Sequence, residues 1–380
     1  MNSKKSTKSA QRPDSVVWIK FAEMERFMAD VFKGLGVPKD EAQICADVLI
    51  TADKRGIDSH GIGRLKTIYY DRIKDGVQFA RTDFDVVREA PATAVVDGHH
   101  GMGMVIAHHA MKMAIEKAKK YGLGMVAVRN STHYGACCYY ALMAIESGMI
   151  GITGTNARPS TAPTFGVENM LGTNPLVFGM PTDEDFPFVL DCATSVSQRG
   201  KIEVYGRAGK NIPSGWVIDE NGRARTDTAQ ILKDLVKGSC ALVPLGGIGE
   251  ETAGYKGYGY AAVVEILSAA LQNGSYLKML LGFENGRKVP YRLGHFFIAI
   301  DVRAFIALDK FKKIAGNICR ALRHSKKMPG ARRIYTAGEK EHLVWLERKN
   351  KGVPVPETLQ NEMMIMRNEL GLTRYKFPFE

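Results

Sequence analysis

The sequence predicts an α/β fold in which helices from both ends of the chain form one lobe beside a central mixed sheet. Apolar residues recur at helical spacing in residues 16–90 and again in residues 304–380. Between them, in residues 91–303, short apolar runs bounded by Gly, Pro or Asn indicate strands. Several of these runs follow one another directly, which argues against the strand–helix alternation of a doubly wound sheet.

Three helices are expected before residue 90. Apolar residues at helical spacing from Phe21 to Phe32 predict the first, which Gly34 and Gly36 end. Pro38 opens the second at a first-turn position. A third pattern ends at Gly76. The second and third helices are expected to turn these residues inward: Ile44, Cys45, Val48, Leu49, Ile62, Leu65, Ile68, Tyr69 and Ile73.

The central region is expected to alternate strands with only a few helices. Its predicted strands are TAVVDG (93–98), GMVAVRN (124–130), GMIGITGTN (148–156), PLVFGMP (175–181), FPFVLDCAT (186–194) and HFFIAIDV (295–302). Its predicted helices span 104–120 and 258–271. Three further helices, at 305–324, 339–351 and 357–370, return the chain to the helical lobe.

Composition and charge exclude several classes of protein. The net charge of +12 fits attraction of small anions, and without zinc-finger spacing or an arginine-rich block no nucleic-acid partner is expected. The six scattered cysteines lack C-x-x-C spacing, so reduced thiols and no metal are expected. Residues 1–15 are polar and basic, which predicts a disordered tail and no secretory signal. With no run long enough for a membrane helix, the predicted location is the cytoplasm.

One motif imitates a dinucleotide fingerprint. Gly101 and Gly103 stand between a predicted strand and a predicted helix. However, Ile106 occupies the third glycine position, and no acid follows a second parallel strand about 20 residues on. A tight turn is therefore the preferred interpretation. The neighbouring pairs His99-His100 and His108-His109 have no carboxylate or cysteine that completes a ligand set, and they are expected to be surface or capping histidines.

The segment DSHGIGR (58–64) carries the first candidate for chemistry. A turn between two helices would expose the His60 imidazole, with Arg64 within one helical turn. An imidazole can exchange the proton of a hydroxyl while a hydride leaves the same carbon, and a guanidinium grips a carboxylate with two hydrogen bonds. An equally weighted alternative is that Asp58 and Ser59 only cap a helix and His60 is solvated.

Further candidates follow predicted strands. His133 comes after the strand MVAV, where α/β proteins tend to place ligands, although a structural histidine is an equal alternative. Asn156 and Asn174 end GTN triplets that can meet an amide or a phosphate, but each alone is more typical of a turn. Lys256 stands between glycines ahead of an apolar helix, a pattern that suits a phosphate contact.

Taken together, these segments resemble the malate/L-lactate dehydrogenase family, the non-Rossmann group that also contains sulfolactate, ureidoglycolate and diketogulonate enzymes. Seven segments in the family's order carry the resemblance: RGIDSHGIGRL (55–65), VAVRNSTHYGACCYYA (126–141), TNARPSTAPTFG (155–166), LGTNPLVFGMP (171–181), FVLDCATSVSQRGKIE (188–203), IPSGWVIDENG (212–222) and GYKGYG (254–259). The chain departs from the family pattern in reading AGE rather than PGE at 337–339, and in extra residues at 248–252.

The resemblance implies a largely antiparallel nicotinamide-binding domain, a homodimer, NAD or NADP as cofactor and a small carboxylate as substrate. It implies that His60, or His133, is the general acid/base and that Arg64 holds the substrate carboxylate. The cofactor contacts that it implies are Ser59, Asn156, Asp191, Cys192, Ala193, Lys256, Gly338 and Glu339.

Three functions remain open from sequence. The first is oxidation of a malate- or lactate-like 2-hydroxy acid. The second is reduction of a cyclic imine carboxylate or oxidation of a ureido acid, since these substrates also place a carboxylate beside the reacting carbon. The third is a basic binding protein on a dehydrogenase scaffold, which the presence of His60, Arg64, His133 and Asp191 argues against.

Overall fold

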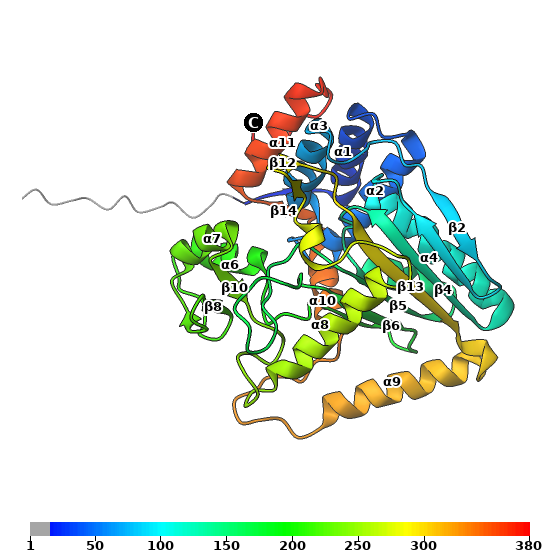
Figure 1. Cartoon of the computed structure of the whole chain (residues 1–380). Coiled ribbons are helices and arrows are strands. Elements are labelled where there is room, and N and C mark those ends of the chain that lie inside the picture. Colours follow the sequence, from blue (N-terminus) through cyan, green and yellow to red (C-terminus); the bar gives the residue numbers. More distant parts are fainter. Residues whose placement is uncertain (1–15) are drawn as a thin grey trace, which may run out of the picture.

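Helices from both ends of the chain form one lobe, as predicted (Figure 1). The computed structural model describes residues 16–380, so the expected tail at 1–15 lies outside the described residues. Strand β1 (Val17–Ile19) pairs antiparallel with β14 (Val353–Val355). The lobe's helices are α1 (Phe21–Gly34), α2 (Lys39–Lys54) and α11 (Glu357–Glu369).

The C-terminal end of the chain covers α1. The Phe27 ring of α1 meets the rings of Tyr375 and Phe377 edge-on, with 5.2 Å between centroids in each pair. The Tyr375 hydroxyl also donates a hydrogen bond to Asp30. All four side chains are buried, so the lobe's core contains residues from both ends of the chain.

The third predicted helix is present, but it is not regular. It consists of a 3₁₀ turn, η1 (Ile62–Arg64), a π-helical stretch, η2 (Leu65–Tyr70), and a short α-helix, α3 (Asp71–Lys74). The inward residues Leu65 and Tyr69 are fully buried as expected. Local π-helix is rare and frequently marks a functional site.

The central sheet has seven strands in the order β2-β3-β4-β13-β5-β6-β7. Only β3 and β4 run parallel, so the predicted largely antiparallel mixed sheet is confirmed. The strands are β2 (Asp85–Glu89), β3 (Thr93–Asp97), β4 (Leu123–Ser131), β5 (Met149–Thr155), β6 (Leu176–Met180), β7 (Phe188–Cys192) and β13 (Leu293–Asp301). The sheet thus begins at Asp85, within the stretch that the sequence suggested for the helical lobe.

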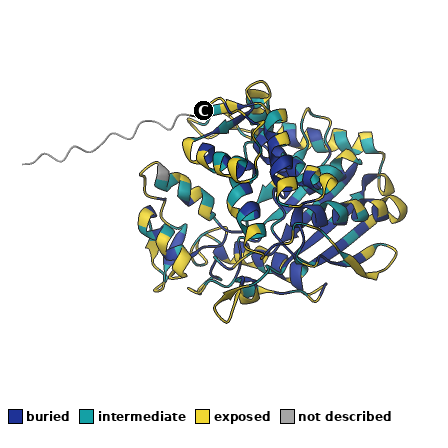
Figure 2. Cartoon of the chain, turned by 90° about the horizontal axis from the view of Figure 1, so that it is seen from above, coloured by how far each residue is buried: buried dark blue, intermediate teal, exposed yellow. Residues whose placement is uncertain are grey.

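Helices cover both faces of this sheet, and buried residues gather in the strands and the helices against them (Figure 2). Helices α4 (Gly103–Tyr121) and α5 (Cys138–Glu146) pack on one face and α8 (Gly254–Ala269) on the other. Gly294 of β13 permits the close approach of α8, because a Cβ there would lie 1.6 Å from the Ser268 carbonyl oxygen. Helix α8 begins four residues earlier than predicted, so Lys256 lies in its first turn.

A small unit that the sequence did not reveal protrudes from the sheet domain (Figure 1). Its elements are α6 (Arg199–Arg207), β8 (Val217–Asp219), β9 (Ala224–Arg225), α7 (Thr228–Lys237) and β10 (Cys240–Leu242). The three strands form their own antiparallel sheet, and Ile202, Ile231 and Leu242 belong to a separate core. Asp227 caps α7 by accepting a hydrogen bond from the Gln230 amide.

The remaining elements connect these parts. They are η3 (Leu277–Leu280), the hairpin β11 (Phe283–Glu284) and β12 (Arg287–Lys288), η4 (Val302–Ala304), α9 (Leu308–His324) and α10 (Glu339–Arg348). Helix α9 runs along the outside of the molecule, away from the helical lobe, whereas α10 contacts α2 (Figure 1). Among residues 16–380, no helix is both long and apolar enough to span a bilayer.

Candidate active site

The turn that carries His60 is closed by a buried carboxylate. Asp53, near the end of α2, accepts a hydrogen bond from the Ile62 amide at 3.0 Å. This bond joins the end of α2 to the start of η1 and fixes the residues between them. Burial raises the pKa of Asp53 well above its usual value. Gly61 lies against the same carboxylate, since a Cβ at this position would stand 1.8 Å from Asp53 Oδ1.

Replacing Gly61 by alanine is therefore expected to lower the free energy of unfolding by about 1–3 kcal/mol, the usual cost of forcing an extra carbon into a packed site. Urea denaturation of the purified variant measures it. Gly259→Ala is the matched control, because a Cβ at this helical position in α8 meets nothing within 4 Å. That variant should be neutral or stabilised by up to about 1 kcal/mol. Equal stabilities for the two variants would contradict the contact with Asp53.

The capping interpretation of Asp58 and Ser59 does not hold. Helix η1 has no side-chain cap, and Asp58 instead pairs with Arg348 of α10, with Oδ2 2.8 Å from Nη2. The Ser59 hydroxyl lies 2.9 Å from His60 Nδ1. Its carbonyl oxygen accepts a hydrogen bond from Arg64 Nε at 2.6 Å. Both side chains expected at the chemistry are thus held by Ser59.

His60 is half-buried and uncharged at neutral pH. Removal from water lowers the pKa of the imidazole to about 4, and the nearby charge of Arg64 adds to this effect. The Arg64 guanidinium faces the first turn of α6, where Nη2 lies 3.2 Å from the place a Cβ of Gly200 would occupy. The small unit therefore adjoins Arg64.

His133 lies beside His60. The two rings are nearly parallel, with centroids 5.8 Å apart. His133 Nδ1 is already engaged, since the Tyr69 hydroxyl lies 2.7 Å away and the Gly135 amide donates to the same nitrogen at 3.3 Å. Burial lowers the pKa of His133 well below its usual value, with further contributions from His60, Arg72 and Arg64. Tyr69, which the sequence showed only as a core residue, is thus a positioning residue for His133.

A cavity of about 150 Å³ opens beside His60. His60 and the predicted cofactor contacts Asp191, Cys192 and Ala193 line it together. The cavity is also lined by residues that the sequence analysis had not singled out. They are Arg55, Ile57, Ala136, Cys137, Cys138, Thr173, Pro175, Val189, Gln198 and Glu341. A volume of about this size accommodates one six-membered aromatic ring.

Asp191 is one of the two carboxylic acids that line this cavity. Its Oδ2 accepts a hydrogen bond at 2.9 Å from the amide of Cys138, the first residue of α5. A helix N-terminus stabilises a carboxylate in this position. Burial nevertheless raises the pKa of Asp191 above its usual value. Glu341 and Arg55 also line the cavity, so it suits a polar ligand more than a hydrocarbon.

Two other predicted cofactor contacts lie apart from the cavity. Asn156 is fully buried, and its amide is used inside the protein, donating to the Ser275 carbonyl at 3.1 Å and accepting from Gly294 at 2.8 Å. Lys256 is exposed in the first turn of α8. The segment before α8 is joined to the cavity wall, because the Leu245 amide donates to the Thr194 carbonyl at 2.8 Å.

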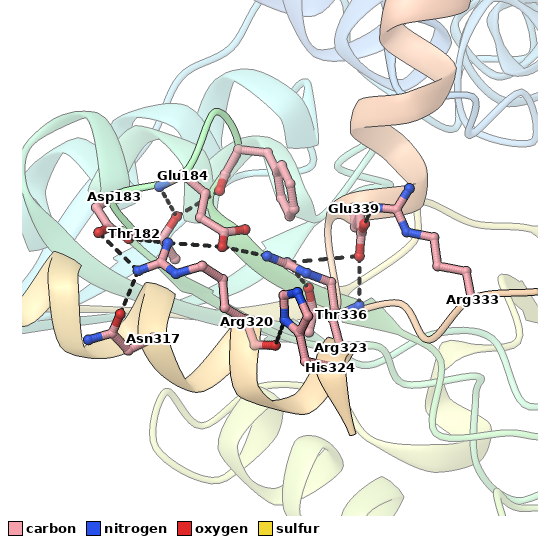
Figure 3. Close-up of polar contacts among 11 residues, drawn as sticks. Thr182, Asp183, Glu184, Asn317, Arg320, Arg323, His324, Arg333, Thr336 and Glu339 are labelled. Atoms are coloured by element: carbon pink, nitrogen blue, oxygen red, sulfur yellow. Dashed lines mark hydrogen bonds and ion pairs between the residues drawn. The ribbon is translucent and has the colours of Figure 1, made fainter. Parts of the chain in front are cut away.

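The segment with Gly338 and Glu339 packs against the start of β7. Gly338 has a left-handed backbone (φ 89°), and a Cβ there would stand 2.6 Å from the Pro187 carbonyl oxygen. Glu339 is buried, accepts a hydrogen bond from the Thr336 amide at 3.1 Å and pairs with Arg333 (Figure 3). Since its carboxylate is already used, Glu341, two residues further along α10, is the acid of this segment that lines the cavity.

The Gly101–Gly103 turn has a packing role. A Cβ at Gly103 would lie 2.3 Å from the Thr132 carbonyl oxygen, and the Gly103 amide donates to the Thr132 hydroxyl at 2.9 Å. Glycine thus lets α4 start against the loop that carries His133. Within the described part of the chain, no group of three or more His, Cys, Asp or Glu side chains could hold a metal ion.

Comparison with known proteins agrees with this geometry. The family model for malate/L-lactate dehydrogenase matches residues 19–364. The chain is 43% identical to malate dehydrogenase of Pyrococcus horikoshii over 346 residues, which are 91% of this chain and 93% of that protein. It is 37% identical to L-sulfolactate dehydrogenase of Methanocaldococcus jannaschii over 356 residues, 92% of this chain and 96% of that protein.

The fold also matches a solved structure. The crystal structure of malate dehydrogenase from Entamoeba histolytica superposes with a TM-score of 0.92 at 43% identity, covering 96% of this chain and 100% of that one. The matches in sequence and in structure both extend over nearly the whole chain, and they agree with the order of the seven segments in the sequence. The chain therefore belongs to the malate/L-lactate dehydrogenase family and is a dehydrogenase of 2-hydroxy acids.

Proposed function

We propose that the protein transfers a hydride between a nicotinamide cofactor and a small 2-hydroxy or 2-oxo acid, with malate and oxaloacetate as the first candidates. The observation that carries this proposal is the position of His60, which lines the ring-sized cavity and adjoins Arg64 through Ser59. Three features thus lie close together: an acid/base group (His60), a cation for a carboxylate (Arg64) and a cavity large enough for a ring. Malate is favoured because curated malate dehydrogenases are 43% identical to the chain.

The proposed roles follow from the charges. Neutral His60 takes the proton of the substrate hydroxyl during oxidation and returns it during reduction. Arg64 has its Nε bound to Ser59, so its terminal nitrogens are the groups that hold the substrate carboxylate. The nicotinamide ring, when bound, accepts or supplies the hydride. His133, held by Tyr69, shields His60 from water and orients it through ring stacking.

The residues of the cavity fit such a cofactor. We place the nicotinamide between His60 and the Asp191–Ala193 segment, in the cavity that Glu341 and Gln198 also line. Lys256, at a helix N-terminus joined to this segment, is the proposed contact for phosphate. The proposed role of Gly338 and Glu339 is indirect: their backbone positions Glu341 in the wall of the cavity.

Absorbance at the nicotinamide band tests the proposal. Purified protein is mixed with NADH and then NADPH, together with oxaloacetate, sulfopyruvate, pyruvate, a cyclic imine carboxylate and oxalurate. Turnover is expected with 2-oxo acids, and most rapidly with oxaloacetate. Faster turnover of the imine or the ureido compound would instead support the second function considered from sequence, which is reduction of a cyclic imine carboxylate or oxidation of a ureido acid. Absence of turnover with both cofactors and every acid would overturn the proposal.

We also propose that the protein is a homodimer, in the cytoplasm, where its six free thiols stay reduced. Helix α9 presents an apolar stripe outward, formed by Ile314, Ile318 and Leu322, which are 53, 56 and 53% exposed. Their spacing of four residues puts them on one side of the helix. A continuous apolar stripe on the outside of a molecule is typical of a protein interface, and twofold dimers are the commonest closed assembly.

Ile318→Glu is expected to convert the dimer to a monomer, because it places a charge in the centre of this stripe. Sedimentation velocity at micromolar concentration measures the mass. Lys313→Glu, which adds the same side chain on the polar side of α9, should remain dimeric. A wild-type monomer, or an Ile318→Glu dimer, would contradict the proposed interface.

A further inference from the structure

Arg55 brings a buried donor without a partner to the cavity that His60 lines. It caps the C-terminal end of α2, and its half-buried side chain lies in the wall of that cavity. Its Nε is buried without a hydrogen-bond partner, and among residues 16–380 it is the only such side-chain atom on a residue that lines the cavity. Since buried polar atoms nearly always have partners, this donor indicates an acceptor that a ligand supplies.

Glu341 of α10 is the matching acceptor in the same wall. It is half-buried, and within the described part of the chain its carboxylate makes neither a hydrogen bond nor an ion pair. The other acid of the cavity differs, because Asp191 already accepts a hydrogen bond from the Cys138 amide. Opposite charges that are partly removed from water ordinarily pair. Arg55 and Glu341 do not, although the cavity that they share measures only about 150 Å³.

Helix packing keeps these two side chains apart. Helix α10 is fixed to the end of α2 on both sides of Arg55 in the sequence. Arg348 Nη1 donates to the Asp53 carbonyl at 3.0 Å, and Val344 Cγ1 stands 2.7 Å from the place that a Cβ of Gly56 would occupy. The spacing of the donor and the acceptor is therefore set by the backbone and is present before any ligand binds, which lowers the cost of binding.

A guanidinium and a carboxylate at such a spacing match a primary carboxamide. The oxygen of a carboxamide accepts hydrogen bonds and its nitrogen donates them. A carboxylate group would satisfy the cation but would be repelled by the acid, and a ketone would leave the acid without a donor. Nicotinamide carries a carboxamide on its ring, and the volume of the cavity suits such a ring.

We propose that Arg55 and Glu341 recognise the carboxamide of the nicotinamide ring, with Arg55 donating to its oxygen and Glu341 accepting from its nitrogen. This inference rests on the proposed function, because it takes the cavity beside His60 as the place of the ring. A ring held at both atoms of its carboxamide cannot turn over. These two side chains therefore also determine which face of the ring is presented to the substrate.

Three dinucleotides that differ only at the carboxamide test the proposal. They are the nicotinamide form, the 3-acetylpyridine form, which has a methyl group in place of the amino group, and the nicotinic acid form. Their Kd values are measured by displacement of NADH or NADPH, whichever binds more tightly, using the fluorescence of the reduced cofactor. The wild type should bind the nicotinamide form about 10-fold or more tightly than either analogue, since each analogue loses a hydrogen bond to a charged group.

Two substitutions separate the roles of the two side chains. Arg55→Met should weaken the nicotinamide and acetylpyridine forms equally, by about 10- to 100-fold, because both have the oxygen. Glu341→Met should weaken only the nicotinamide form and so abolish its advantage over the acetylpyridine form. Arg55→Lys should recover part of the loss. Glu341→Gln should retain most of the affinity for the nicotinamide form, because its amide oxygen also accepts, and should bind the nicotinic acid form more tightly than the wild type does.

Matched controls remove the same charges outside the cavity. Lys54→Met changes the residue next to Arg55, at a side chain that pairs with Glu25 at 3.8 Å. Glu347→Met changes an acid of α10 that pairs with Lys351 at 3.1 Å. Both variants should leave the three Kd values unchanged. ADP-ribose, which lacks the nicotinamide ring, should bind equally to the wild type and to every variant.

The binding data can overturn the proposal without reference to turnover. Unchanged ratios between the three forms in both methionine variants would refute it. An equal loss of ADP-ribose affinity in Arg55→Met would assign Arg55 to the phosphates or the adenosine instead. A protein that shows the expected pattern but reduces no 2-oxo acid has lost the proposed function and kept the carboxamide contact. Normal turnover of oxaloacetate by Arg55→Met and Glu341→Met, with unchanged ratios, would remove this contact alone.

Discussion

His60→Ala is expected to lower the rate of hydride transfer about 100- to 10,000-fold, the contribution typical of a positioned acid/base group. His60 lines the cavity proposed for the nicotinamide and lies next to Arg64, whereas His133 Nδ1 is occupied by Tyr69 and Gly135. His133→Ala should therefore cause a smaller loss. Stopped-flow absorbance measures the rate, and cofactor titration should show affinity little changed by His60→Ala.

The protonation of His60 determines in which direction the rate should change with pH. The pKa of His60 is lowered to about 4 by burial, with a smaller effect of Arg64. The neutral form, which acts as the base in oxidation, is thus populated above that value and lost as the pH falls through it. In the oxidation direction, kcat/KM of the wild type should stay level near neutrality and fall only in acid, and His60→Ala should abolish this dependence.

His108→Ala is a suitable control, because His108 is also half-buried with a lowered pKa but lies on α4 beside Tyr139. Its turnover should stay near that of the wild type. Near-normal turnover in His60→Ala together with its loss in His133→Ala would exchange the roles of the two histidines.

Arg64→Lys is expected to raise KM for the 2-oxo acid and to lower kcat at the same time. Lysine keeps the charge, but it loses both the bidentate grip on the carboxylate and the bond from Nε to the Ser59 carbonyl. Because a misplacement of about 1 Å at a reacting carbon can cost about 100-fold, we expect a loss in kcat/KM of that order. Affinity for the cofactor alone should barely change.

Steady-state kinetics and cofactor titration of the same preparation separate the two effects. Arg303→Lys is the matched control: it also disrupts a two-point ion pair, with Asp301, but in an exposed position outside the site. Unchanged substrate kinetics with weakened cofactor binding would move Arg64 to the dinucleotide phosphates.

The periodicity of apolar residues was sufficient to predict where most helices and strands lie, but not which strands pair with one another. Helices α1, α2 and α11 and strands β3 to β7 fall where their apolar spacing placed them. Nothing local to β13 predicts that it inserts between β4 and β5, because that position depends on pairings across more than 130 residues. The strands of the small unit span only two or three residues, too few to show alternation.

Helix α7 is a different case, because the sequence did contain a signal for it. Asp227 precedes a run with Ile231, Leu232 and Leu235 at helical spacing, and Gly238 follows it. These are the usual start and stop signals of a helix.

The active site shows the same division between local and distant contacts. His60 and Arg64 were predictable together, because four residues of chain hold them within one turn. The approach of His133 to His60 was not predictable from the sequence, because it depends on how α2, η2 and β4 pack. The π-helical form of η2 could not be predicted from apolar spacing either. At residues 337–341, the family resemblance implied Glu339, whereas the structure has Glu341 in the lining of the cavity.

The tie between Asp58 and Arg348 has a consequence for how the enzyme matures during synthesis. The turn bearing His60 leaves the ribosome early, but the arginine that anchors it follows 290 residues later. At about 5–20 residues per second, that is a delay of roughly 15–60 s. Until then, a nascent chain already has His60, Arg64, His133 and Asp191, but it lacks both this anchor and the strand that pairs with β1. Competence to bind substrate is thus acquired only after the segment that carries β14 and Arg348 has been synthesised.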